Sequence, residues 1–164
     1  MPRLFGLILI PFLGACTFSS PLSGPGYTSG QDLEAQGITE VVVSLTEAET
    51  RNDNQARAKF WSYIRKIDAS LETQEGLIAS SKRTEIFGSR SWTMTVWKDR
   101  DSLRKFLASE AHVAAANDVH RMVQRGRFAT FVLAAGDLPL DWQTAEKRLA
   151  TDGREMTKYV GQDR

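Results

Sequence analysis

Cysteine, histidine and long apolar runs are scarce in this sequence, and each scarcity excludes a class of protein. The 164 residues contain one cysteine, Cys16, so no disulfide can form within the chain. The two histidines, His112 and His120, would lie about 12 Å apart along one helix, too far to share a metal ion. No metal site is therefore predicted. Ser91 and Ser109 lack the arrangement with a histidine and an acid that activates a nucleophilic serine, so nucleophilic hydrolysis has no support.

The sequence also lacks an excess of charge of either sign. It has 21 Lys and Arg against 20 Asp and Glu, interleaved, for a net charge of +1. Such a chain has no basic field to attract nucleic acid, and no nucleic-acid partner is predicted. A length of 164 residues with 41% hydrophobic residues leaves room for one globular domain with extensions.

The longest apolar run, residues 4–13, is too short to cross a membrane, which takes about 20 apolar residues. Arg3 precedes the run, and the small residues Gly14 and Ala15 follow it. A basic residue, a short apolar run and small residues are typical of a secretory signal, so residues 1–15 are predicted to be a signal peptide.

Cys16 follows these small residues directly, an order that resembles the lipobox of bacterial lipoproteins. In that family the cysteine is acylated and becomes the first residue of the mature chain. The resemblance implies a protein of the cell envelope that meets the membrane only through a lipid anchor. Thr17 rather than Asp in the next position implies the periplasmic face of the outer membrane in a Gram-negative cell. An ordinary signal peptide with an incidental cysteine is the alternative.

Residues 16–37 are rich in Ser, Gly and Pro and are predicted to form a flexible tether. From residue 38 the pattern changes to alternating strands and helices. Strands are predicted over residues 39–46, 77–87, 91–97 and 127–135. One helix is predicted between Asp53 and Gly76, and a second, broken helix between Asp99 and Gly126 with a new start at Ser109.

The order β-α-β-β-α-β over residues 38–136 predicts an α+β, ferredoxin-like antiparallel sheet with both helices on one face. Three of the strands carry apolar side chains on both faces, so the second face needs a cover. A second copy of the chain would supply it by forming a homodimeric α/β barrel. Residues 137–164 are predicted to be a C-terminal extension with a short helix.

Residues 76–142 carry an ordered set of motifs: a glycine-led strand, a strand ending in Val96-Trp97, a Lys-Asp turn, a Leu-x-x-Phe helix and a Ser-x-x-His step. This order resembles the antibiotic-biosynthesis-monooxygenase-like group of dimeric α/β barrels, in its uncharacterised branch. The resemblance implies a homodimer. It also implies that, if the protein is an enzyme, it oxidises a small aromatic or polyketide-like molecule with O2 and without a dedicated cofactor.

Haem-degrading members of that superfamily use an asparagine on the first strand and a tryptophan and a histidine in the helix after the third strand. In this sequence Phe106 and Ala116 stand at the two helix positions, and the first strand, TEVVVSLT, contains no asparagine. Haem oxygenation of that kind is therefore disfavoured. Haem is kept only as a ligand to be bound.

His112 is the candidate catalytic residue, in the first turn after the Ser109 cap. A helix N-terminus disfavours the imidazolium, so a neutral imidazole there can accept a proton from a phenolic or enolic substrate. The alternatives are a histidine that hydrogen-bonds a backbone carbonyl at the helix break, or a ligand to haem iron. Apolar side chains that would suit the wall of a substrate pocket, and equally a core, are Trp92, Met94, Trp97 and Phe106.

Two functions remain open on these grounds. The first is a cofactor-independent, monooxygenase-like activity on a small hydrophobic molecule, with His112 as the base. The alternative is a non-catalytic envelope module that binds haem or another hydrophobic ligand. A structural dimer with a filled pocket is a third possibility.

Overall fold

A computed structural model describes residues 16–25 and 27–156 and has a six-stranded antiparallel sheet at its centre. The strands are β1 (Thr17–Ser19), β2 (Glu40–Thr50), β3 (Leu77–Glu85), β4 (Arg90–Trp97), β5 (Val123–Ala134) and β6 (Arg154–Glu155). Their order across the sheet is β1-β3-β4-β2-β5-β6. The helices are α1 (Gly30–Ala35), α2 (Asn54–Leu71), α3 (Arg100–Leu107), α4 (Glu110–Met122) and α5 (Trp142–Asp152), with a 3-10 turn η1 (Ala135–Asp137) after β5. The four central strands with α2, α3 and α4 form the ferredoxin-like unit, which confirms the predicted fold class.

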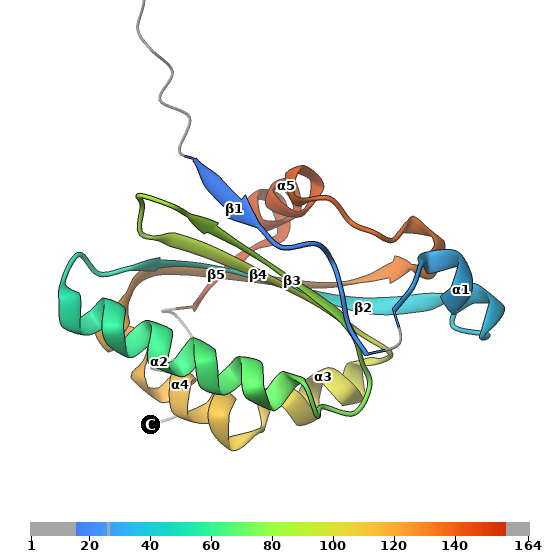
Figure 1. Ribbon diagram of the computed structural model, residues 1–164, viewed down its shortest axis with the longest axis horizontal. Helices are drawn as coiled ribbons and strands as arrows, with labels where there is room; N and C mark the ends of the chain where they lie inside the picture. Colours follow the sequence, from blue (N-terminus) through green and yellow to red (C-terminus); the bar gives the residue numbers. More distant parts are fainter. Residues whose placement is uncertain (1–15, 26, 157–164) are drawn as a thin grey trace, which may run out of the picture.

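Helices α2, α3 and α4 lie on one face of the sheet (Figure 1). Each begins at a side chain that accepts a hydrogen bond from the first turn, because the first N–H groups of a helix have no partner within it. Asp53 accepts from Ala56 N at 2.7 Å, and Asp99 accepts from Ser102 N at 2.7 Å. Ser109 begins α4 in the same way, so the broken helix divides at the predicted residue.

The helix after this break ends earlier than predicted. It stops at Met122, not at Gly126, and β5 begins at Val123. Val123 has extended dihedral angles (φ −112°, ψ 129°), is buried, and pairs with Thr50 of β2. A β-branched side chain that finds both a strand partner and a core contact favours the strand over another helical turn.

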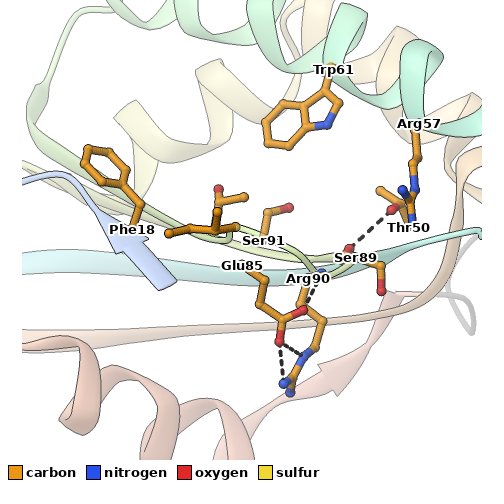
Figure 2. A pocket seen from close by; sticks show the side chains of 11 residues that line it. Phe18, Thr50, Arg57, Trp61, Glu85, Ser89, Arg90 and Ser91 are labelled. Atoms are coloured by element: carbon orange, nitrogen blue, oxygen red, sulfur yellow. Dashed lines mark hydrogen bonds and ion pairs between the residues drawn. The ribbon is translucent and has the colours of Figure 1, made fainter. Parts of the chain in front are cut away.

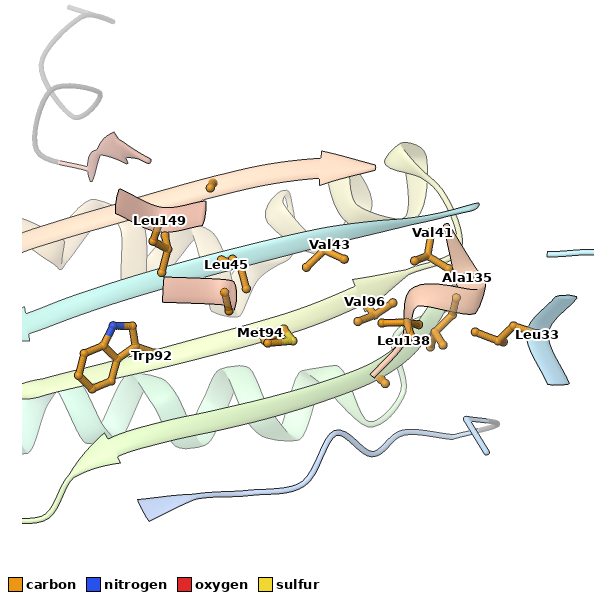
Figure 3. Packing of buried hydrophobic residues seen from close by; sticks show 14 residues of the cluster. Leu33, Val41, Val43, Leu45, Trp92, Met94, Val96, Ala135, Leu138 and Leu149 are labelled. Atoms are coloured by element: carbon orange, nitrogen blue, oxygen red, sulfur yellow. The ribbon is translucent and has the colours of Figure 1, made fainter. Parts of the chain in front are cut away.

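The opposite face of the sheet is covered by the chain itself, a role that the sequence analysis gave to a second copy. Helix α5 lies on this face and buries Ala145 and Leu149 against it, 0% and 1% exposed. Leu138 and Leu33 add to the same cover. The buried residues of this cluster that come from the central strands include Val41, Val43, Leu45, Trp92, Met94, Val96 and Ala129 (Figure 3). The homodimer stays a prediction, but the apolar face that motivated it is occupied.

The prediction of a flexible tether over residues 16–37 is corrected by the structure. Strand β1 pairs with β3, with Thr17 opposite Glu85, and α1 begins at the Ser29 cap. Leu33 of α1 is 3% exposed, and Leu22 and Tyr27 pack on the same cluster. These apolar side chains are too widely spaced to form a periodic pattern, so composition alone did not reveal that they pack on the sheet.

Two predicted segments extend beyond the described residues. The predicted signal peptide, residues 1–15, lies outside them, as do the last eight residues of the C-terminal extension. The short helix predicted in that extension is α5, and Asp141 caps it by accepting from Thr144 N at 2.9 Å. Among the helices that the structure describes, none combines the length and apolar character needed to span a membrane.

Candidate functional site

The helix-facing side of the sheet carries a line of hydroxyl side chains where a continuous apolar core would be expected. Alternate residues of a strand share a face, so residues 91, 93, 95 and 97 of β4 point toward the helices. Trp97 fixes which face this is, because it packs with Leu103 and Phe106 of α3. Five hydroxyl residues on this side of β4 and β2, called the hydroxyl track below, are Ser91, Thr93, Thr95, Ser44 and Thr46.

The hydroxyl track is ordered by hydrogen bonds. The Thr46 and Thr93 hydroxyls, opposite each other on β2 and β4, are hydrogen-bonded. The Thr95 hydroxyl donates to the Ser44 carbonyl at 3.4 Å and accepts from Trp97 Nε1 at 2.8 Å. These bonds hold three of the five hydroxyls in place, and the track ends at the buried indole of Trp97.

Two apolar clusters lie on either side of the hydroxyl track. One contains Val42, Leu71, Trp97, Leu103 and Phe106. The other contains Ala56, Phe60, Met122 and Val123. Between them Ser44, Thr46 and Thr93 are only half-buried, whereas Trp97 is fully buried. A half-buried polar strip between apolar walls suits a small molecule that combines a flat apolar body with hydroxyl or carbonyl groups.

At the Ser91 end, the hydroxyl track meets a cleft of about 380 Å³ between α2 and the β3–β4 hairpin. Small-molecule pockets occupy roughly 300–1,000 Å³, so the cleft is large enough for one small ring system. Figure 2 shows Trp61 and Arg57 descending from α2 and Phe18 standing on β1. The lining residues are Phe18, Thr50, Arg57, Trp61, Thr84, Glu85, Ile86, Gly88, Ser89, Arg90 and Ser91.

The charged residues that line the cleft differ in where their side chains lie: Glu85 and Arg90 pair on the α5 side of the sheet, whereas Arg57 reaches the cleft from α2 (Figure 2). Buried Glu85 accepts from Arg90 Nε at 2.8 Å and from Arg90 N at 3.1 Å. Burial by itself raises the pKa of Glu85, but the hydrogen bonds from Arg90 outweigh it and hold that pKa below its usual value. Arg57 instead donates to the neutral Asn52 amide at 3.2 Å, and none of the described carboxylates forms an ion pair with it. Arg57 can therefore bind a phenolate or carboxylate oxygen.

The four predicted pocket residues lie on two sides of the sheet. Trp92 and Met94 belong to the cluster beneath α5 (Figure 3), with exposures of 6% and 0%. Trp97 and Phe106 stack on the helix side with ring centroids 5.0 Å apart. One pocket cannot be lined by all four, because the sheet separates the two pairs. None of them lines the cleft, and their contact with a substrate stays a prediction.

His112 lies at the break between α3 and α4, beside Phe106 at 5.2 Å between ring centroids. Burial lowers the pKa of His112 below its ordinary value of 6.5, while a hydrogen bond with the Leu107 backbone acts in the opposite sense. The imidazole is therefore neutral at neutral pH, as expected for a base. It is separated from Thr95 of the hydroxyl track by the stacked rings of Phe106 and Trp97.

Replacing His112 by glutamine is expected to reduce the loss of stability on acidification. Because burial depresses the pKa of His112 in the folded state, the unfolded state takes up the proton first as the pH falls through 6.5. Stability is then lost until the folded-state pKa is reached. Urea unfolding from about pH 7.5 to about pH 5.5 tests this. An equal loss in the wild type and in His112→Gln would contradict it.

The sequence analysis did not single out Trp61, Arg57 or Thr46 as functional residues. Trp61 is 39% exposed above the cleft (Figure 2). A signal for the hydroxyl track was present, since Ser44-x-Thr46 and Thr93-x-Thr95 both place hydroxyls at alternate strand positions. Only the pairing of β2 with β4 shows that the two sets share one face.

Metal and haem sites have little support in the described residues. No group of three or more His, Cys, Asp or Glu side chains that could hold a metal ion occurs among residues 16–25 and 27–156. An axial ligand to haem iron needs an imidazole that faces a cavity. The ring of His112 instead packs on Phe106 and hydrogen-bonds the Leu107 backbone, and His112 is not among the residues that line the cleft. His112 therefore does not fit this role.

Comparison with known proteins establishes the fold. No protein-family model and no curated protein matches the sequence. Among solved structures, PA3566 from Pseudomonas aeruginosa is 10% identical, with a TM-score of 0.51 over 57% of this chain and 94% of its own. SO0527 from Shewanella oneidensis is 12% identical, with a TM-score of 0.51 over 58% of this chain and 95% of its own.

A variant of SnoaB, a cofactor-independent oxygenase from Streptomyces nogalater, is 20% identical, with a TM-score of 0.49 over 61% of this chain and 98% of its own. About two fifths of this chain has no counterpart in these structures. Identities this low bear on the fold alone, and it is PA3566 and SO0527 that establish it. The chain therefore shares the α+β, ferredoxin-like fold of its structural neighbours.

Proposed function

We propose that this protein is monooxygenase-like and binds a small aromatic or polyketide-like molecule between the sheet and α2. The observation that carries the proposal is the hydroxyl track, a row of hydroxyl groups that leads from the cleft to Trp97 and in which those of Thr46, Thr93 and Thr95 are held by hydrogen bonds. An aromatic ring would lie under Trp61, with its oxygen substituents toward the track and Arg57. The resemblance of residues 76–142 to the antibiotic-biosynthesis-monooxygenase-like group supports the same class of ligand.

The chemistry proposed for such a ligand needs no external reductant. Oxidation of a phenol ring by one O2 gives a quinone and one water, so the substrate supplies all the electrons and protons. The protein would bind the ring, favour the phenolate and exclude water. Arg57 would stabilise the phenolate oxygen. His112 is the predicted acceptor of the proton, and because the rings of Phe106 and Trp97 separate it from the hydroxyl track, it would take the proton only after those rings move.

The alternative function, a non-catalytic module for a hydrophobic ligand, is favoured by one observation. Two aromatic rings separate His112 from the hydroxyl track, and its own imidazole hydrogen-bonds the backbone at the helix break. In this alternative His112 stabilises the helix break, and the hydroxyl track binds the ligand without turnover.

One titration separates the two functions. Hydroxylated naphthalenes and anthracenes are titrated against the protein by tryptophan fluorescence, while an oxygen electrode records O2 uptake. Thr93→Val removes one hydroxyl of the track with little change in shape and is expected to weaken binding roughly 2- to 12-fold, the value of one hydrogen bond. Thr151→Val removes an exposed hydroxyl from α5, on the other side of the sheet, and serves as the control.

Each outcome assigns a function. Saturable binding with O2 uptake supports the monooxygenase-like activity. A fall of that uptake in His112→Ala supports His112 as the base, and unchanged uptake rejects it. Saturable binding without O2 uptake supports the non-catalytic module. Equal affinities for Thr93→Val, Thr151→Val and the wild type would show that the ligand does not lie on the hydroxyl track.

We further propose that Cys16 is acylated and anchors the protein in the cell envelope, at the outer membrane if the cell is Gram-negative. The order of Arg3, the apolar run and the small residues before Cys16 supports this proposal. In the structure Cys16 is exposed and its thiol is free. The proposed homodimer would have to use a surface other than the strand residues that α5 covers.

A further inference from the structure

The end of the sheet beside Cys16 exposes three large apolar side chains. Phe87, in the turn between β3 and β4, is 93% exposed, and its neighbour Ile86 is 57% exposed. Phe18 on β1 is 68% exposed and stands on the rim of the cleft with Ile86. We call Phe18, Ile86 and Phe87 the apolar tip. Large apolar side chains gathered at one exposed point mark a surface that meets a protein or a membrane.

Cys16 is fixed to this tip by the backbone. Its carbonyl accepts a hydrogen bond from Ile86 N at 2.9 Å, and β1 begins at the next residue, Thr17, opposite Glu85 of β3. Figure 1 shows the chain entering β1 at the end of the sheet where β3 turns into β4. Cys16 is therefore bonded directly to the hairpin, with no flexible segment between them.

We infer that the apolar tip inserts into the lipid interface of the membrane that holds Cys16. This inference rests on the proposed acylation of Cys16. Acyl chains buried in a bilayer hold the residue that carries them at the membrane surface. Because the backbone of Cys16 is bonded to Ile86, the apolar tip is held at the same depth, and apolar side chains gain by leaving water there.

The position of the apolar tip also bears on the ligand. Phe18 and Ile86 belong to the lining of the cleft, so the mouth of the cleft would open at the lipid surface. A hydrophobic molecule dissolved in the bilayer could then enter the cleft without crossing bulk water. The inference thus narrows the proposed ligand to one that partitions into lipid.

The test uses the whole chain, produced with residues 1–15 in a bacterium that acylates lipoproteins and reconstituted in vesicles of phosphatidylethanolamine and phosphatidylglycerol. Cys16 is the only cysteine of the sequence, so once it is acylated the variant Phe87→Cys has a single free thiol for an environment-sensitive fluorophore. The control is Glu75→Cys, in the exposed turn that joins α2 to β3 at the other end of the sheet.

Mass spectrometry first establishes whether Cys16 carries acyl chains. We expect the probe at position 87 to shift to shorter wavelength, to be quenched by spin-labelled lipid, and to lose quenching by aqueous iodide several-fold relative to position 75. Acylated, vesicle-bound protein with equal iodide quenching at both positions would overturn the inference and leave the anchor intact. Protein without acyl mass on Cys16 would overturn the anchor and the inference together.

Discussion

Replacing Leu149 by alanine is expected to lower the free energy of unfolding by about 2–5 kcal/mol, the usual range for a buried leucine. Leu149 is 1% exposed and belongs to the cluster that α5 buries on the sheet (Figure 3). Truncating it leaves a cavity between the helix and the strands, which the stiff sheet cannot close. Equilibrium unfolding in urea measures the change.

Lys147→Ala is the matched control, because Lys147 lies on the same helix with its side chain exposed. That substitution is expected to change the free energy of unfolding by no more than about 0.5 kcal/mol. Equal effects of the two substitutions would mean that α5 does not cover the sheet in solution. If a second copy covered the sheet instead, the unfolding midpoint would rise with protein concentration, because association stabilises only the folded form.

The second large effect is expected at Trp97, where alanine should lower the free energy of unfolding by about 3–5 kcal/mol. Trp97 is fully buried, stacks on Phe106 and donates its indole N–H to Thr95. Trp97→Phe keeps most of the apolar volume but removes that donor. Trp97→Phe should therefore destabilise the fold less than Trp97→Ala does. Its cost is about 1 kcal/mol for the lost hydrogen bond, plus a further cost for the unfilled volume.

Trp61→Ala is the informative comparison, because it removes an indole from the other end of the site. Trp61 is 39% exposed, with an edge-on contact to Phe60 at 5.3 Å, so its loss should destabilise the fold much less than the loss of Trp97. Ligand affinity should fall more in Trp61→Ala than in Trp97→Ala, because Trp61 lines the cleft. Unchanged affinity in Trp61→Ala would contradict the placement of the ligand under α2.

Together these variants separate residues that hold the fold from residues that contact a ligand. Trp92 and Met94, predicted as pocket walls, belong to the first group in the structure, because they lie in the cluster under α5. Their substitution should lower the free energy of unfolding. Ligand affinity should stay unchanged as long as the variant remains folded. Trp97 takes part in both roles, since it closes the inner end of the hydroxyl track.

The sequence by itself determined the ferredoxin-like order of elements. Strand alternation in residues 91–97, the Asp53, Asp99 and Ser109 caps and the helical spacing of apolar residues are local signals, and local hydrogen bonding realises them. A local signal was less reliable where a contact with a distant part of the chain favoured a different structure. Val123, predicted in the helix, lies in β5 because it pairs with a strand and packs in the core.

Only the tertiary structure decided what covers the second face of the sheet and where a ligand can lie. The cover comes from α5 and from Leu22, Tyr27, Leu33 and Leu138, and the spacing of these apolar side chains along the chain does not show which surface they pack on. The hydroxyl track depends on the register of β2 with β4, which places Thr46 opposite Thr93 although 47 positions separate them. Pairings between distant segments are set by the packing of the whole sheet, and no local stretch of the chain encodes them.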